Sequence, residues 1–491
     1  MQHERTGNIR KGTRTRNKLA LVLFLKRFFK EKLDKSGKIC GEALRCHNNE
    51  GGSDMDSYIA KVKNSLVSLI ESLDSYAYMW SVNPGKDFTR NRKLPFSTMI
   101  KSLIEMEGGA LDYELMKLFD FKLDMPSSSA FIQQRAKLRP ETFDFIFQEF
   151  NQCFPCTKKF KGYRLLACDG SDLNISRNPE DTENYFQSNP GEKGFNLLHL
   201  NAFYDLCERR YHSIFLQPGR KANERAALCA MADRQTDTDK TIIIADRGYE
   251  GYNVFAHIER KGMYYLIRVQ DGHQNGILSG IELPDTASFD IDIERCLTRK
   301  QTNLVKSESE KYVFIPKKST FDFLDLHFDL YYPIHLRVLR FEIGKGQFEC
   351  IITNLDRNEF SVEDIKQMYH MRWGIETSFR ALKYTIGLSR FHSKKVEFIK
   401  QEIYARLILY NFCEIIATHI VIQNNTCKHT YQLNFSAAVR ICRQFLLDRS
   451  ILSPPDVEAL LLKYVQPIRN GRHDPRKVKP RSFVSFTYRV A

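Results

Sequence analysis

Strand-length apolar runs alternate with helical repeats through the middle of the chain. We predict strands at 163–169, 197–205, 209–217, 241–246 and 264–269, and helices at 222–234 and 251–261. The second and third strands form a hairpin that turns at Cys207-Glu208. Three strands followed by alternating helices and strands predict an α/β fold for this part of the chain.

Different patterns flank this region. Helical periodicity dominates from 57 to about 155, and apolar helical patterns return in the C-terminal part, for example at 437–447. Between 271 and 360 the chain alternates as strands do, with no convincing helix before Ser361. We therefore predict a β-rich insertion within the α/β region, with helical segments on both sides.

A polar stripe marks one helical segment near residue 370. Tyr369, Arg372, Glu376 and Lys383 follow the spacing Y-x2-R-x3-E-x6-K. At about 100° per residue they share a stripe roughly 60° wide on one helix. The stripe holds a carboxylate flanked by two cations and a phenol. Taken alone, Glu and Lys on one helical face are typical of a solvated surface.

Two predicted strands each end in an aspartate. Asp169 follows Leu165–Cys168, and Asp246 follows Thr241–Ala245. The end of a buried strand is the sheet edge where α/β folds bind ligands. Either aspartate alone is more typical of a turn or a helix cap. Together with the Glu376 helix, however, the two strands favour a shared site of three carboxylates.

These motifs resemble those of a known family. D-G-S at Asp169, D-R-G-Y at Asp246 and the Tyr369–Lys383 signature are similar to the DDE transposases of the insertion-sequence-four family. The resemblance extends from about Phe88 to the C-terminus. It implies that Asp169, Asp246 and Glu376 form a catalytic triad on an RNase H-like fold. It also implies that Tyr369, Arg372 and Lys383 hold the DNA end that is cut.

The implied function is that of a transposase. Such an enzyme binds the ends of an insertion sequence, hydrolyses a phosphodiester and joins the freed 3′-hydroxyl to target DNA. Two Mg²⁺ ions, which Mn²⁺ can replace, stabilise the attacking and leaving oxygens of both steps. Two Asp and one Glu offer the oxygen ligands that Mg²⁺ prefers. Water and the DNA hydroxyl are the nucleophiles, so the protein needs none of its own.

The resemblance and the patterns together give an expected domain plan. We expect a basic arm at 1–50, a helical DNA-end-binding domain at 51–160, an RNase H-like catalytic domain at 161–270 and 361–425, a β-rich insertion at 271–360, and C-terminal helices with a basic tail at 426–491. Some relatives cut through a DNA hairpin and use a Trp of the insertion. The tryptophans here are Trp80 and Trp373, which leaves hairpin formation open.

Charge favours double-stranded DNA as the partner. Of a formal net charge of +15, residues 1–40 carry 12 Lys/Arg against 3 Asp/Glu, and residues 463–491 carry 8 against 1. Two basic arms around a near-neutral body suit phosphate contacts, although solubilising tails have the same composition. In addition, a turn between helices at 130–138 and from Arg139 places Arg135 and Lys137 where they could read DNA, if they face outward.

Other compositional features favour a soluble, intracellular protein with no membrane segment, and the resemblance implies a bacterial cytoplasmic, nucleoid-associated one. The apolar stretch 405–421 contains Arg406 and Glu414, so a core helix is expected there. The twelve cysteines are scattered, and a zinc site at Cys153-Phe-Pro-Cys156 is disfavoured because zinc needs four ligands. A homodimer on DNA is implied by the resemblance alone.

Two alternatives remain open at this point. A nuclease of the same fold could cleave nucleic acid without joining ends, and only a strand-transfer assay separates it from a transposase. A DNA-binding protein descended from a transposase could have lost turnover. The presence of all three carboxylates argues against this second alternative.

Overall fold

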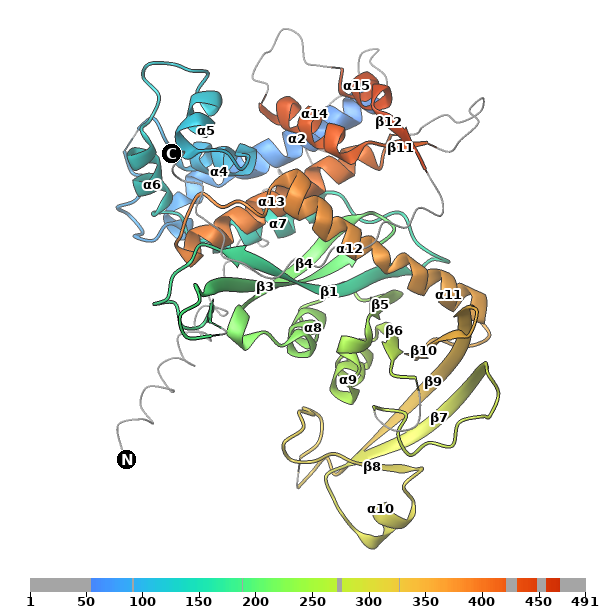
Figure 1. Ribbon diagram of the computed structural model, residues 1–491. Helices are drawn as coiled ribbons and strands as arrows, with labels where there is room; N and C mark the ends of the chain where they lie inside the picture. The colour runs from blue at the N-terminus through green and yellow to red at the C-terminus, as the bar shows by residue number, and fades with distance from the viewer. Residues whose placement is uncertain are drawn as a thin grey trace, which may run out of the picture. The chain divides into compact units, whose positions relative to one another are not determined.

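A computed structural model describes residues 54–90, 92–187, 189–271, 276–325, 327–420, 431–447 and 456–468. The chain divides into two compact units (Figure 1). Of the described residues, 156–381 form the sheet unit, and 54–155 together with 382–468 form the helical unit. The basic arm expected at 1–50 and most of the basic segment 463–491 lie outside the described residues.

The sheet unit is built on the strands that the apolar runs predicted. They are β1 (Arg164–Ile175), β3 (Phe195–Asp205), β4 (Arg210–Pro218), β5 (Thr241–Ala245) and β6 (Tyr264–Val269). Their order in the sheet is β4-β3-β1-β5-β6. β3 pairs antiparallel with both β4 and β1. On the other side of β1, β5 and β6 run parallel to it. A short β2 (Tyr185–Phe186) pairs with the start of β3.

The β-rich segment extends this same sheet. It contributes β7 (Phe289–Thr298), β8 (Tyr312–Phe314), β9 (Tyr331–Gly344) and β10 (Gln347–Thr353). Strand β10 pairs with β6, and the order continues as β10-β9-β7-β8. The strands expected between 271 and 360 are thus confirmed. The periodicity missed the short helix α10 (Asn303–Ser307), because five residues are too few to show a helical repeat.

Helices cover the two faces of the sheet (Figure 1). On one face lie α8 (Glu224–Asp233) and α9 (Tyr252–Arg260), each within two residues of its predicted bounds. Apolar side chains such as Ile243, Phe255 and Ile267 form the core beneath them. On the other face run α11 (Val362–Met371) and α12 (Trp373–Arg380). Ser361 starts α11 with a capping box that includes Asp364, which fixes where this helix begins.

The helical unit is organised around α13 (Val396–Ala417), which is buried along almost its whole length. Packed in this unit are α2 (Asp54–Ser72), α4 (Phe96–Glu105), α5 (Leu111–Leu118), α6 (Ser128–Arg135), α7 (Glu141–Cys153), α14 (Phe435–Leu447) and α15 (Val457–Lys463). The predicted core helix at 405–421 is confirmed by α13. No helix among the residues described has the length and apolar character needed to cross a membrane. The expected catalytic domain included 361–425, whereas α13 belongs to the helical unit.

The prediction that Arg135 faces outward is wrong. Its side chain is 2% exposed, and its Nη1 lies 2.9 Å from Oε1 of Glu402, which is equally buried. Its Nε also donates to Gln401 Oε1 at 2.9 Å. Burial alone would raise the pKa of Glu402, but Arg135 and His392 outweigh it and lower that pKa to about 2. Arg135 therefore stabilises the helical unit. Lys137 is half-buried, and its DNA contact stays a prediction.

This pairing yields a stability prediction. Replacing Arg135 by Met leaves the Glu402 carboxylate buried without its cation, so we expect the free energy of unfolding to fall by about 3–5 kcal/mol. Lys137→Met, two residues away, is the matched control and is expected to change it by less than about 1 kcal/mol. Urea denaturation of both variants measures the difference. Equal small losses would show that the ion pair does not stabilise the unit.

Candidate active site

The first two carboxylates come from neighbouring parallel strands. The last paired residues of β1 and β5 are Cys168 and Ala245. Asp169 and Asp246 each occupy the next position, so the register places them at the same level of the sheet. Asp169 accepts a hydrogen bond from the Gly170 amide at 2.8 Å, and Asp246 accepts one from the Arg247 amide at 2.6 Å. These local bonds orient both carboxylates, that of Asp246 just past the end of β5 and that of Asp169 within β1, which continues to Ile175.

Glu376 is brought to this edge by α12, which packs on β1. Two contacts define how closely the helix approaches. The Ser378 hydroxyl lies 2.9 Å from the Tyr211 hydroxyl of β4, and both are buried. Gly374 also faces the sheet unit, where an added Cβ would lie 3.0 Å from Leu206 Cδ2. A larger residue at this position would push α12 away, so glycine permits the close packing that positions Glu376.

The pKa of Asp169 is affected by burial and by nearby carboxylates. Burial raises its pKa to about 6, and the negative charges of Glu376 and Glu224 add to that effect. The Gly170 amide and Arg372 act in the opposite direction. Like charges influence one another in this way only when they are close. Burial is thus the main cause of the raised pKa of Asp169, and the charges of Glu376 and Glu224 contribute less.

Arg372 lies among the three predicted catalytic acids. Its side chain is 4% exposed, and its Nη1 is 3.1 Å from Glu376 Oε1. Burial alone would lower the pKa of Arg372, but Tyr369, Asp246, Glu376 and Asp169 together raise it. The pKa of Arg372 thus responds to all three carboxylates, and its ion pair is with Glu376.

Tyr369 is buried beside Arg372, and its hydroxyl donates to Asp246 Oδ1 at 3.5 Å. The guanidinium carbon of Arg372 lies 5.7 Å from the Tyr369 ring centre. The structure therefore brings Tyr369, Arg372 and Glu376 together with both aspartates.

Arg268 is a member of this site that the sequence analysis missed. It lies on β6, where its Nε is 3.0 Å from Asp246 Oδ1 and its Nη1 is 3.3 Å from Glu349 Oε1. The only signal in the sequence was a single charge within the otherwise apolar run Tyr264–Val269. Its pairing with Asp246 depends on the register between β5 and β6 and cannot be read from spacing.

A histidine and two more acids lie behind Gly170. His199 Nδ1 is 2.8 Å from Asp172 Oδ1, and its Nε2 is 3.2 Å from Glu224 Oε1. Burial alone would lower the pKa of His199, but the two carboxylates outweigh it and raise that pKa to about 9. The sequence analysis did not identify this cluster, because its members come from β1, β3 and α8.

The donor set suits a hard divalent cation, because it consists of carboxylate oxygens. In the present arrangement, however, no three His, Cys, Asp or Glu side chains of the described part of the chain are grouped closely enough to hold one ion. The expected convergence to metal-bridging distance is therefore not seen. Instead, Glu376 pairs with Arg372 and Asp246 pairs with Arg268. A bound cation would require these guanidinium groups to move aside.

Lys383 lies in η4 (Ala381–Ile386), a π-helical turn that follows α12. The uniform helical spacing used for its prediction does not continue through this turn, because a π-helix has more residues per turn than an α-helix. Lys383 is grouped with the helical unit, whereas the carboxylates belong to the sheet unit. The predicted stripe is therefore supported for Tyr369, Arg372 and Glu376 only.

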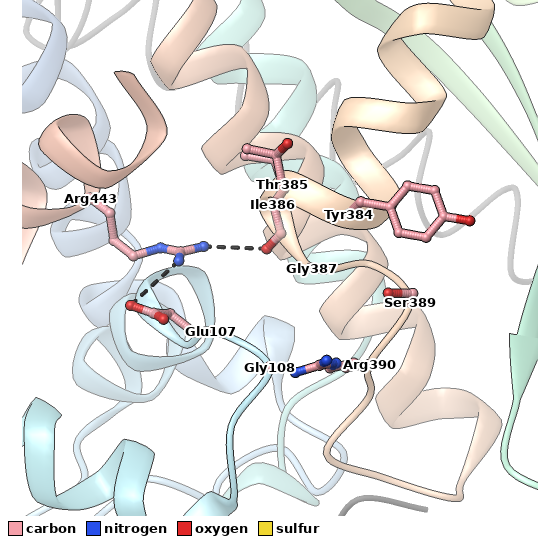
Figure 2. A pocket seen from close by; sticks show the side chains of 9 residues that line it. All are labelled: Glu107, Gly108, Tyr384, Thr385, Ile386, Gly387, Ser389, Arg390 and Arg443. Carbon is pink, nitrogen blue, oxygen red and sulfur yellow. Dashed lines mark hydrogen bonds and ion pairs between the residues drawn. The ribbon is translucent and has the colours of Figure 1, made fainter. Parts of the chain in front are cut away.

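A hollow of about 250 Å³ opens in the helical unit beside this turn (Figure 2). It is lined by Glu107, Gly108, Tyr384, Thr385, Ile386, Gly387, Ser389, Arg390 and Arg443. Arg443 spans it, with Nη1 3.5 Å from Glu107 Oε1 and Nη2 donating to the Ile386 carbonyl at 3.3 Å. Arg390 is exposed and has no ion pair within the described ranges. The hollow therefore offers cations and hydroxyl groups next to Lys383.

Comparisons with known proteins agree with these features. Residues 160–412, just over half of the chain, match the family model of the transposase DDE domain. The transposase InsG for insertion sequence element IS4, from Escherichia coli strain K12, is 28% identical over 458 residues, which cover 87% of this chain and 95% of that protein.

A solved structure, the piggyBac transposase synaptic complex with hairpin DNA, shares 8% identity at a TM-score of 0.39 and covers 85% of this chain and 87% of its own. A likeness this low supports no conclusion. The family match, in contrast, contains Asp169, Asp246 and Glu376 and covers most of the sheet unit. The chain belongs to the DDE transposase family, and it is of the IS4 type.

Proposed function

We propose that this protein binds the ends of an insertion sequence, cleaves DNA by metal-assisted phosphodiester hydrolysis and joins the 3′-hydroxyl ends to target DNA. The observation that carries this proposal is geometric: Asp169 and Asp246 occupy one level of the sheet, Arg372 pairs with Glu376, and the neighbouring Tyr369 reaches Asp246. These acids come from β1, the end of β5 and α12. They are the acids that the transposase resemblance assigns to catalysis.

The sheet supports an RNase H-like catalytic core. Three antiparallel strands are followed across the sheet by two strands parallel to β1, in the order β4-β3-β1-β5-β6. Along the sequence, these elements follow one another as three strands, a helix, a strand, a helix and a strand. In this proposal β7 to β10 form the insertion that separates the core from the Glu376 helix. Phe and Tyr of the insertion would take the place of a stacking Trp if cleavage passes through a hairpin.

Asp169, Asp246 and Glu376 would hold two Mg²⁺ ions, or Mn²⁺ in their place. The ions supply positive charge that stabilises the attacking and leaving oxygens of an in-line displacement. Without bound cations, arginine side chains of the protein supply the positive charge at these acids. Arg372 and Arg268 neutralise the acids now, and both can turn toward DNA phosphates once cations replace them. Tyr369 orients Asp246 through its hydroxyl.

Contacts with the DNA end would come from Arg372, Tyr369 and Lys383, and from the hollow beside Lys383. Arg390 points its unpaired charge to solvent there, and Tyr384 is exposed over three-quarters of its surface. A guanidinium and an open aromatic ring are suited to a phosphate and a base, respectively. Action as a homodimer on two DNA ends, and association with the bacterial nucleoid, are proposals that rest on the resemblance.

The carboxylates give the first functional prediction. Glu376→Gln keeps the side chain's size but removes a charge that holds metal, so we expect Mn²⁺-dependent nicking of DNA carrying the flanks of this gene to fall by at least about 100-fold. DNA binding, measured by mobility shift, should persist.

The matched control is Glu363→Gln, which alters an exposed acid in the first turn of α11 and should leave nicking unchanged. Equal nicking by wild type and Glu376→Gln would contradict the proposed triad. Binding without nicking in either protein would favour a DNA-binding protein without turnover. Nicking without joining in a strand-transfer assay would identify a nuclease.

The hollow gives a second prediction. If Arg390 contacts a backbone phosphate, Arg390→Gln should weaken DNA binding and reduce the slope of log affinity against log salt by about 1. Lys101→Gln is the control, because Lys101 is already paired with Glu71 at 2.5 Å. Fluorescence anisotropy across a salt series measures both slopes. An unchanged slope for Arg390→Gln would remove the hollow from the DNA interface.

A further inference from the structure

We propose that Glu224 is a fourth acidic residue of the catalytic site, where it helps to hold the divalent cation, and that Asp172 and His199 keep it in position. The inference rests on the function proposed above. It concerns residues outside the three acids and the Tyr369–Lys383 signature.

The three residues form a continuous row from the sheet to α8. Asp172 of β1 and His199 of β3 are directly opposite each other in the antiparallel register. One ring nitrogen of His199 is 2.8 Å from Asp172 Oδ1, and the other is 3.2 Å from Glu224 Oε1. His199 therefore lies between Asp172 and Glu224 and links the Glu224 carboxylate to the strand that bears Asp169.

Two glycines show that the backbone leaves space for this row. A Cβ at position 170 would overlap Glu224 Oε1 and would lie 2.5 Å from His199 Nε2. A Cβ at position 248 would lie 3.5 Å from Glu224 Oε2. Gly170 directly follows Asp169, and Gly248 is two residues after Asp246. The carboxylate of Glu224 consequently reaches between β1 at Gly170 and the turn that follows Asp246.

A purely structural role explains this placement poorly. Asn223 already caps α8 by accepting a hydrogen bond from the Ala226 amide, so the helix does not need Glu224 as its cap. Glu224 also lies against Gly170 and Gly248, beside the two aspartates proposed to hold a dication, and a dication there would attract its carboxylate. The carboxylate is 37% exposed, so it remains accessible from solution.

The test measures metal binding directly. The full-length protein, in complex with DNA that carries the flanks of its gene, is titrated with Mn²⁺, and free Mn²⁺ is followed by electron paramagnetic resonance. We expect Glu224→Gln to weaken Mn²⁺ binding by about 10- to 100-fold. Glu363→Gln, another first-turn acid of a helix, should bind as wild type does. Glu376→Gln serves as the positive control for loss of binding.

A second variant tests the position of the carboxylate separately from its charge. Gly170→Ala retains every acid, but its methyl group occupies the space of the Glu224–His199 contact. We expect it to weaken Mn²⁺ binding about as much as Glu224→Gln. Glu224→Asp, which keeps a shorter carboxylate, should restore part of the affinity. Thermal unfolding checks that each variant is folded.

The outcomes separate this inference from the proposed function. If Glu376→Gln loses Mn²⁺ while Glu224→Gln and Gly170→Ala bind as wild type does, the inference is overturned and the proposed function stands. If wild type itself neither binds Mn²⁺ nor nicks DNA, both are overturned. A loss in Glu224→Gln and Gly170→Ala with normal binding by Glu363→Gln supports the fourth acid.

Discussion

The buried guanidinium of Arg372 and the acids around it depend on one another. A cation that is 4% exposed can remain charged only if anions compensate for its lost hydration, and Glu376, Asp246 and Asp169 do so. In turn, acids gathered at one sheet edge repel one another unless a positive charge lies among them. Neither group would be stable alone in this place. The backbone must therefore bring them together, and it does so through parallel pairing of β1 with β5 and close packing of α12 on β1.

Local patterns were sufficient to predict much of this arrangement. The runs that became β1 and β5 are apolar, so both strands could be predicted from neighbouring residues, and Asp246 directly follows β5 as expected. The prediction that the first strand ends at Asp169 is wrong, because β1 continues to Ile175 through its antiparallel pairing with β3. The closeness of Tyr369, Arg372 and Glu376 follows from spacing, although the one helix predicted for them is two, with Arg372 between α11 and α12. Lys383 did not follow the same rule, because a π-helical turn comes between Arg380 and the end of the signature.

Features that depend on pairing between distant segments could not be predicted. Arg268 and His199 are found at the site only because strand register places them opposite particular acids. The prediction for Arg135 failed because it also depended on a distant segment. A polar residue on a predicted helix was expected to face solvent, yet the buried Glu402 of α13 lies within its reach. A sequence pattern records polarity, but it does not record whether a buried partner of opposite charge exists.

Negative charge exceeds positive charge at the proposed catalytic site. Asp169, Asp246, Glu376 and Glu224 together carry more negative charge than Arg372 and Arg268 neutralise, since His199 is shared with Asp172. Two divalent cations would balance the four acids, and both arginines would then be free to face phosphates. The DNA backbone in turn supplies anions for those arginines. Under the proposed function, metal and DNA therefore favour each other's binding, because each compensates for the charge that the other displaces.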